Sequence, residues 1–239
     1  MANSISVFVP RETSAVSLGA DEIGDRILSL AVKNKADITL IRNGSWGMCW
    51  LEPLIEVDVN GERIAYGPIC IEDVADLFKA DFLKGGDHKL KLGKVSDIPY
   101  LKNQDRWTFR RCGLIDPVSI HDYCDNGGFD GFTAASKMGA DKIIEEIKKS
   151  GLRGRGGAGF PTGIKWQTVA NASGDQKYIA CNADEGDSGT FSDRMLMEGD
   201  PFCLIEGMMI AGLAVGANRG YIYLRSEYPL TREIFSEAL

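Results

Sequence analysis

Residues 151–166 read GLRGRGGAGFPTGIKW, and this stretch says most about how the chain folds and what it binds. Six of its sixteen residues are glycine, three are basic and none is acidic, although the whole chain has a formal net charge of −7. Glycine at this density lets backbone N–H groups point toward one ligand and lets that ligand approach closely. Arg153, Arg155 and Lys165 add positive charge around the same point. The stretch therefore predicts a phosphate-binding loop, better suited to two phosphates than to one.

Two known phosphate-binding patterns do not describe this loop. Residues 154–159 satisfy the formal pattern G-x-G-x-x-G, which indicates a dinucleotide-binding fold only where a strand precedes it. Here residues 140–151 precede it, with isoleucines at helical spacing and Gly151 at a C-cap position, so a helix is predicted instead. A Walker A loop needs Gly-Lys-Ser/Thr, which is absent. A flexible linker is the alternative, but the embedded Phe160-Pro161 and Lys165-Trp166 pairs are unusual in linkers.

A second polar loop, residues 182–189, holds three carboxylates within four residues. The apolar residues 178–181 before it predict a short buried strand. After it, Asp200-Pro201 is typical of a helix start, an apolar helix is predicted from residue 202 to 216, and residues 221–224 predict another strand. Strand, helix and strand at this spacing predict a βαβ crossover with a parallel pair of strands.

Ligands of parallel sheets bind beyond the carboxyl ends of the strands, where Asn182, Asp184 and Glu185 are expected. Carboxylates and an amide suit the hydroxyl groups of a ribose or ribityl chain. The alternative is a solvated acidic turn that caps the next element. Taken together, the two loops predict a phosphorylated, polyhydroxylated cofactor, and ATP, NAD and FMN all meet that description.

Three segments resemble the flavoprotein subunit of respiratory complex I and its relatives, the diaphorase subunits of NAD-linked hydrogenases and of soluble NAD-dependent formate dehydrogenases. They are residues 151–166, residues 181–194 (CNADEGDSGTFSDR) and residues 220–229 (GYIYLRSEYP). The acidic stretch DEGDSG at residues 184–189 follows the formate dehydrogenase style, where complex I members usually have Asp-Glu-x-Glu-Pro-Gly.

The front of the chain is most similar to the beta subunit of formate dehydrogenase. The segments that carry this likeness are FVPR at residues 8–11, IRNGSWGMCWLEP at residues 41–53 and AYGP at residues 65–68. The resemblance implies an α/β protein with an N-terminal thioredoxin-like domain followed by the first half of the FMN-binding α/β domain of the family.

The same resemblance implies FMN and NAD as cofactors, with hydride transfer from nicotinamide C4 to flavin N5. It implies that the flavin and its phosphate are lined by Gly154, Arg155, Gly156, Gly157 and Lys165. Asn182, Asp184 and Glu185 would hold the flavin edge and the ribityl chain. Phe160 would contact the dinucleotide, and Asp187 takes the place of a family glutamate near the nicotinamide. No side chain is expected to act as an acid, because the flavin accepts the hydride.

Family members continue through a ubiquitin-like module and a helical bundle with a four-cysteine [4Fe–4S] site. The resemblance therefore implies a C-terminally truncated chain that ends at Leu239, inside the flavin domain, with the cluster expected only in the missing part. The implied partners are iron–sulfur subunits of the same oxidoreductase: a two-iron ferredoxin-like subunit and a catalytic subunit.

Three regions are predicted. Residues 1–83 read β-α-β-β-β-α, with a hairpin turn at Asn60-Gly61, and resemble a thioredoxin-like domain that lacks the cluster cysteines of its ferredoxin-like kin. We interpret it as a structural or docking domain. Residues 84–133 are predicted to be a linker and docking segment, either packed against the flavin domain or a solvated tether. Residues 134–239 are the N-terminal part of the FMN- and NAD-binding domain.

The six cysteines show no short metal-binding pairing, and the chain has only two histidines, so no metal site is predicted. Without a signal-peptide pattern, we expect reduced thiols and a cytoplasmic location. Cys181 and Cys203 are expected to be packing residues, and Cys49 is the one to test for reactivity.

The overall composition, 44% hydrophobic and 26% charged, is typical of an α/β protein. No apolar run reaches the ~20 residues of a membrane-spanning helix, so no direct membrane insertion is expected. The acidic balance argues against nucleic acid as a partner. Three functions follow as hypotheses: an NAD(H):FMN oxidoreductase subunit, a non-catalytic docking fragment of the same complex, or a nucleotide-binding module for phosphoryl transfer. The missing Gly-Lys-Ser/Thr loop weighs against the third.

Overall fold

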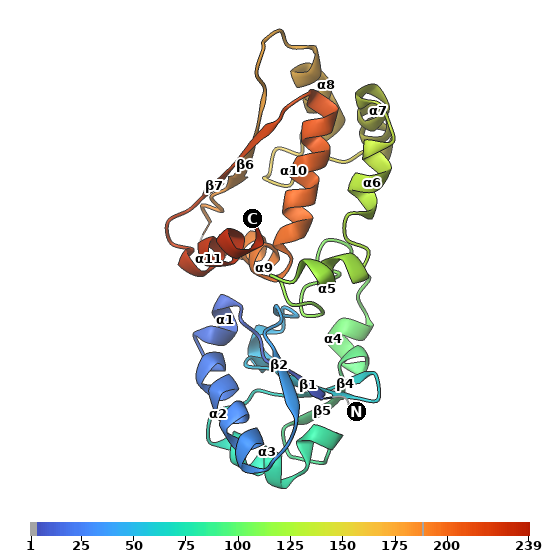
Figure 1. Ribbon diagram of the computed structural model, residues 1–239. Helices are drawn as coiled ribbons and strands as arrows, with labels where there is room; N and C mark the ends of the chain where they lie inside the picture. Colours follow the sequence, from blue (N-terminus) through green and yellow to red (C-terminus); the bar gives the residue numbers. More distant parts are fainter. Residues whose placement is uncertain (1–3, 188) are drawn as a thin grey trace.

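The computed structural model describes residues 4–187 and 189–239. Figure 1 shows a sheet domain formed by the N-terminal part of the chain at one end, and a mostly helical unit formed by the C-terminal part at the other. The first three residues and Ser188, a member of the predicted acidic loop, lie outside the described residues.

The N-terminal domain is built on a mixed five-stranded sheet with the order β2-β1-β3-β4-β5. Strands β1 and β2 are parallel, whereas β3 runs antiparallel to both β1 and β4. The elements of this domain are β1 (Ile5–Phe8), α1 (Thr13–Val16), α2 (Ala20–Lys33), β2 (Ile38–Ile41), η1 (Cys49–Leu51), β3 (Ile55–Val59), β4 (Glu62–Tyr66), α3 (Asp73–Lys79) and η2 (Phe82–Lys84). A strand–helix–strand unit followed by an antiparallel hairpin and a helix is the predicted thioredoxin-like arrangement, and the order of the elements along the chain confirms it.

The sheet extends beyond residue 83, the expected end of this domain. Strand β5 (Lys91–Lys94) pairs antiparallel with β4, and η3 (Val95–Asp97) and α4 (Pro99–Lys102) follow it. Val95, Ile98 and Leu101 pack with Met48 and Leu54 in a second small core. Residues 91–101 are therefore part of the sheet domain and not a solvated tether. The sequence does not indicate strand β5, because glycine and lysine are not typical strand residues.

The C-terminal unit is mainly helical. Its elements are α5 (Ile120–Asp125), α6 (Asp130–Ser136), α7 (Ala140–Ser150), α8 (Thr162–Asn171), β6 (Tyr178–Ala183), α9 (Ser192–Gly199), α10 (Pro201–Val215), β7 (Arg219–Leu224) and α11 (Pro229–Ala238). The helix predicted over residues 140–151 is present as α7. Among the described residues, no helix has both the length and the apolar character that a bilayer crossing requires.

The predicted βαβ unit is present. Strands β6 and β7 are parallel, with Tyr178 opposite Arg219 and Ala183 opposite Leu224. The apolar helix α10 connects them after α9, and Asp200 caps its start by accepting a hydrogen bond from the Cys203 N–H at 3.3 Å. In Figure 1, α10 lies beside the β6–β7 pair. The carboxyl ends of both strands therefore lie at the same edge, next to the polar residues 182–190.

Candidate functional site

The glycine-rich loop, residues 151–161, connects α7 to α8. Helix α7 ends at Ser150, with Gly151 in the left-handed conformation, as the sequence predicts for a loop that leaves a helix. The loop closes on itself, because the Gly154 N–H donates to the Phe160 carbonyl and the Thr162 N–H donates to the Leu152 carbonyl, both at 2.9 Å. A helix, α8, also follows the loop, which the sequence reasoning missed.

The physical requirement for glycine differs between positions of this loop. Gly157 and Gly159 have φ angles of +102° and +60°, which side chains of L-residues rarely adopt. Gly156 has no positive φ, and a Cβ added there would meet no atom of the chain within 4 Å. The fold itself therefore does not require glycine at position 156, whereas a ligand that approaches the backbone closely would.

Exposed basic residues lie in this loop and in the first turn of α8. The predicted residues Arg155 and Lys165 are both exposed, and Phe160 is half exposed. Helix α8 has no acidic residue in its first turn and no side-chain cap, so its N-terminal N–H groups and dipole favour an anion. Arg153 is used differently, because it donates to the Gly159 carbonyl at 3.0 Å and braces the loop.

The acidic loop, residues 184–190, connects β6 to α9. Asn182 at the end of β6 is exposed, and its side-chain oxygen accepts a hydrogen bond from the Asp184 N–H at 3.3 Å. Asp187 is exposed too and accepts from the Gly189 N–H at 3.2 Å. Of the residues expected beyond the strand end, Asp184 and Glu185 follow β6, whereas Asn182 is the last but one residue of the strand.

Glu185 is bonded inside the protein. Its carboxylate accepts from the N–H groups of Asp193 at 2.8 Å and Arg194 at 3.0 Å, and so caps the start of α9. The Tyr228 hydroxyl donates to it at 3.0 Å, and the Arg225 guanidinium donates to its backbone carbonyl. This arrangement corresponds to the alternative expected for the acidic stretch, a turn that caps the next element.

Each loop is held separately. Among the described residues, no hydrogen bond or ion pair joins the glycine-rich loop to the acidic loop. A ligand that needs both loops must therefore bridge them.

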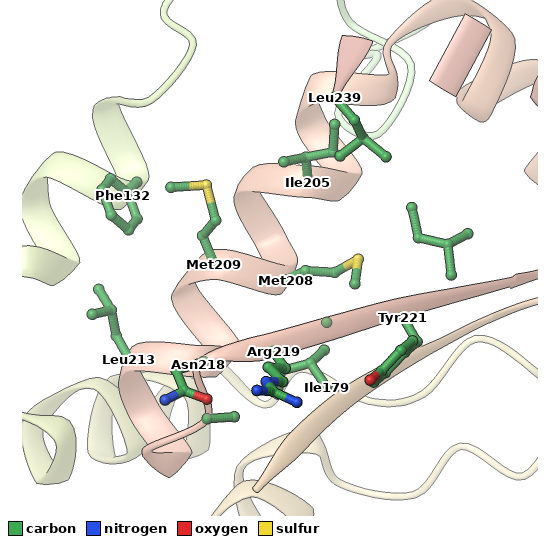
Figure 2. A pocket seen from close by; sticks show the side chains of 14 residues that line it. Phe132, Ile179, Ile205, Met208, Met209, Leu213, Asn218, Arg219, Tyr221 and Leu239 are labelled. Carbon is green, nitrogen blue, oxygen red and sulfur yellow. The ribbon is translucent and has the colours of Figure 1, made fainter. Parts of the chain in front are cut away.

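A cavity of about 640 Å³ lies beside the strands, but none of the predicted site residues lines it. Figure 2 shows Met208, Met209 and Leu213 of α10 on one side of it, and Ile179 and Tyr221 of the two strands on the other. Its lining is mainly apolar. The predicted site is formed instead by two exposed loops.

The cysteines do not form a metal site. All six are free, and no cluster of cysteine, histidine and carboxylate side chains suited to a metal occurs among the described residues. Burial and the charges of Glu12 and Glu52 raise the pKa of the Cys49 thiol, which disfavours the reactive thiolate. Burial also raises the pKa of Cys181 and Cys203, consistent with packing roles.

Residues 147–239 match a family model described as the Nuo51 FMN-binding domain. The matched segment contains both the glycine-rich loop and the acidic loop.

Individual relatives are similar to just over half of the chain. The chain is 49% identical over 138 residues to the HndC component of the NADP-reducing hydrogenase of Solidesulfovibrio fructosivorans, covering 58% of this chain and 28% of that one. It is 50% identical over 140 residues to a component of the NADH-quinone oxidoreductase of Rhodobacter capsulatus, covering 58% and 32%. The chain thus spans less than a third of the length of these relatives.

Solved structures resemble the chain more distantly. An NAD⁺-reducing [NiFe]-hydrogenase in the air-oxidized state has a TM-score of 0.46 at 20% identity, covering 100% of this chain and 40% of that one. A thioredoxin-like [2Fe–2S] ferredoxin from Aquifex aeolicus has a TM-score of 0.34 at 17% identity, covering 39% and 94%.

Proposed function

We propose that residues 134–239, which make up most of the C-terminal unit, bind FMN and NAD(H), and that the chain is the hydride-transferring part of an NAD-dependent oxidoreductase. The observation that carries the proposal is the exposed glycine-rich loop with Arg155 and Lys165 beside an uncapped helix start. It lies in the segment that matches the FMN-binding family model. A loop of this kind suits phosphate groups, which both cofactors carry.

In this proposal the glycine-rich loop holds phosphate and the flat face of the flavin. Gly154, Gly156 and Gly157 allow close approach of the cofactor to the backbone, and Arg155 and Lys165 neutralise phosphate charge. Phe160, whose ring is half exposed, contacts the dinucleotide. The open space around Gly156 fits this assignment, because the cofactor would fill it.

The acidic loop would hold the rest of the flavin. Asn182 and Asp184 present an amide and a carboxylate that can bond ribityl hydroxyls, and Asp187 lies in the position proposed to face the nicotinamide. Glu185 is proposed to act through its backbone and through the shape of the loop, since its carboxylate already accepts hydrogen bonds from α9 and Tyr228.

The reaction needs no acid or base from the chain. FMN supplies the chemistry, because its N5 accepts a hydride from nicotinamide C4. The proposed work of the protein is to align the two rings through its two loops and to balance the phosphate charge with Arg155 and Lys165.

We further propose a multi-subunit oxidoreductase of the formate dehydrogenase type, in which this chain is the beta subunit. The support is the sequence likeness of residues 8–11, 41–53 and 65–68, together with the DEGDSG form of the acidic loop. Its partners would be a two-iron ferredoxin-like subunit and a catalytic subunit, and a [4Fe–4S] cluster would belong to the family's C-terminal part. The second candidate, a docking fragment without its own catalysis, is favoured by the exposed placement of both loops.

Flavin titration of the 239-residue chain tests the proposal. FMN fluorescence should be quenched on binding, and NADH added without oxygen should bleach the bound flavin. Arg155→Ala or Lys165→Ala should each weaken FMN binding about tenfold or more, because a charge-assisted hydrogen bond to phosphate is lost. Bound flavin that NADH cannot bleach would favour the docking role. FMN affinity unchanged in both variants would overturn the phosphate assignment.

A further inference from the structure

The start of α9 connects the acidic loop to the N-terminal domain. Arg194 donates its backbone N–H to the Glu185 carboxylate, and its guanidinium nitrogen Nη2 pairs with the Glu12 carboxylate at 3.2 Å. The same nitrogen donates to the Ser14 hydroxyl at 3.2 Å. One residue of α9 therefore contacts both the loop and the other domain.

Glu12 is a rigid partner for Arg194. It is 0% exposed and caps α1, accepting hydrogen bonds from the Ser14 N–H at 2.9 Å and the Ser14 hydroxyl at 3.0 Å. Removing the cationic partner of a buried carboxylate strongly destabilises the folded protein, because the buried charge is left without compensation. The pair therefore fixes the position of Arg194 relative to the sheet domain.

A second contact fixes α9 one turn further along. Glu198 is 0% exposed and accepts from the Thr13 N–H and the Thr13 hydroxyl, both at 2.8 Å. It also accepts from the Thr231 hydroxyl of α11 at 2.7 Å. Positions 194 and 198 lie four residues apart and thus on the same face of α9, so α1 holds this helix at two points.

The backbone of the acidic loop needs such support. Glu185 and Phe191 have φ angles of 44° and 38°, in the left-handed region that non-glycine residues rarely occupy. Such conformations persist only where the surrounding structure determines them. Here the surroundings are the first turn of α9, which receives the Glu185 cap, and the Arg194 side chain, which lies 5.3 Å from the centre of the Phe191 ring.

We propose that Glu12 of the N-terminal domain is a positioning residue for the cofactor site, and that it acts through Arg194 on the acidic loop. The thioredoxin-like domain then holds part of the flavin site in shape and is more than a docking module. The effect on cofactor affinity rests on the proposed function, whereas the effect on the loop does not.

A double-mutant cycle tests this path. Glu12→Gln and Arg194→Gln should each weaken FMN binding about tenfold, and the double variant should bind no more weakly than Arg194→Gln, because the two residues act as one unit. Arg194→Lys should recover part of the affinity. The matched control is Glu237→Gln, which breaks the Arg11–Glu237 pair between the same two domains without touching the acidic loop. Affinities are compared well below the unfolding temperature of each variant, so that loss of global stability does not enter.

Hydrogen exchange of the ligand-free chain supplies a second readout. The backbone amides at positions 193 and 194 should exchange faster in Glu12→Gln and in Arg194→Gln, and at the wild-type rate in Glu237→Gln. Additive losses of affinity, or unchanged exchange in Glu12→Gln, would overturn the proposal. If the wild-type chain binds no FMN, the proposed function fails, and the exchange rates still decide whether Glu12 controls the loop. If Glu12→Gln does not fold, Arg194→Gln and Arg194→Lys carry the same test.

Discussion

The glycine-rich loop and the acidic loop belong to one candidate site, but the rest of the molecule supports them differently. The glycine-rich loop is closed by its own backbone and is open to solvent around Gly156. The acidic loop depends on α9, on Tyr228 and, through Arg194, on the buried Glu12 of the other domain. We infer that changes in the first loop alter binding without altering stability, whereas changes around the second alter both.

The largest effect is expected in the glycine-rich loop, where a change should alter FMN binding but not stability. The double variant Arg155→Ala/Lys165→Ala should lower FMN affinity by about a hundredfold or more, since two charge-assisted contacts to phosphate are lost. Its urea unfolding midpoint should stay within error of wild type, because both side chains are exposed. Lys149→Ala, at an exposed lysine just before the loop, is the control and should bind FMN normally. A large loss of stability in the double variant would contradict the comparison.

The second effect is on stability and concerns the domain that supports the acidic loop. Glu52 is 4% exposed, and burial raises its pKa from 4.5 to about 7. Because the folded-state pKa is the higher one, the stabilisation is present below pH 4.5 and is lost as pH rises through about 7. Relative to Glu52→Gln, the wild type should therefore lose about 1–3 kcal/mol of stability between about pH 5 and about pH 8, because only the carboxylate ionises. Urea unfolding at both pH values measures this. An equal difference at both would contradict it.

The glycine-rich loop should not share this dependence, because residues 151–166 contain no acidic residue or histidine. The free energy of unfolding of Arg155→Ala should therefore follow the wild-type pH profile. A changed profile would mean that the two loops are coupled in the ligand-free chain.

The third effect tests the cap at Glu185. Glu185→Gln should destabilise the chain by about 1 kcal/mol, since a neutral amide is a weaker acceptor at the start of α9. Urea unfolding should show the loss. Asp187→Asn is the matched control, because Asp187 is exposed and its side chain accepts from the Gly189 N–H of its own turn. Equal stability of the two variants would mean that the cap contributes nothing.

Local patterns in the sequence predicted most elements and the position of both loops. The alternation of the early strands, the Asn60-Gly61 turn and the Asp200-Pro201 helix start are signals of neighbouring residues, and the structure has the elements they predict. The pairing of β5 with β4 was not predictable, because Gly93 and the lysines around it lack strand propensity. The Arg194–Glu12 pair joins residues 182 positions apart, and no local sequence pattern predicts such a contact.

The cap at Glu185 was weighed only as an alternative, because its acceptor lies eight and nine residues before the amides it binds. A typical N-cap lies two or three residues before its amides. The sequence could therefore show that carboxylates gather after β6, but not which of them serves the fold. Only the contacts in the structure distinguish Glu185, whose carboxylate accepts hydrogen bonds from α9, from the exposed Asn182 and Asp187.

The smallest effect isolates a single methyl group. Gly156→Ala adds a Cβ where the chain has open space and an ordinary φ, so it should leave stability unchanged or raise it by about 0.4–1 kcal/mol. FMN affinity should nevertheless fall about threefold to tenfold, because the methyl group occupies the space proposed for the cofactor. Gly207→Ala, at an exposed position of α10 that also has open space, is the matched control for the added methyl group and should bind FMN normally. If the two variants bind FMN equally well, the backbone at Gly156 does not approach the cofactor, and the absence of a side chain there has no functional reason.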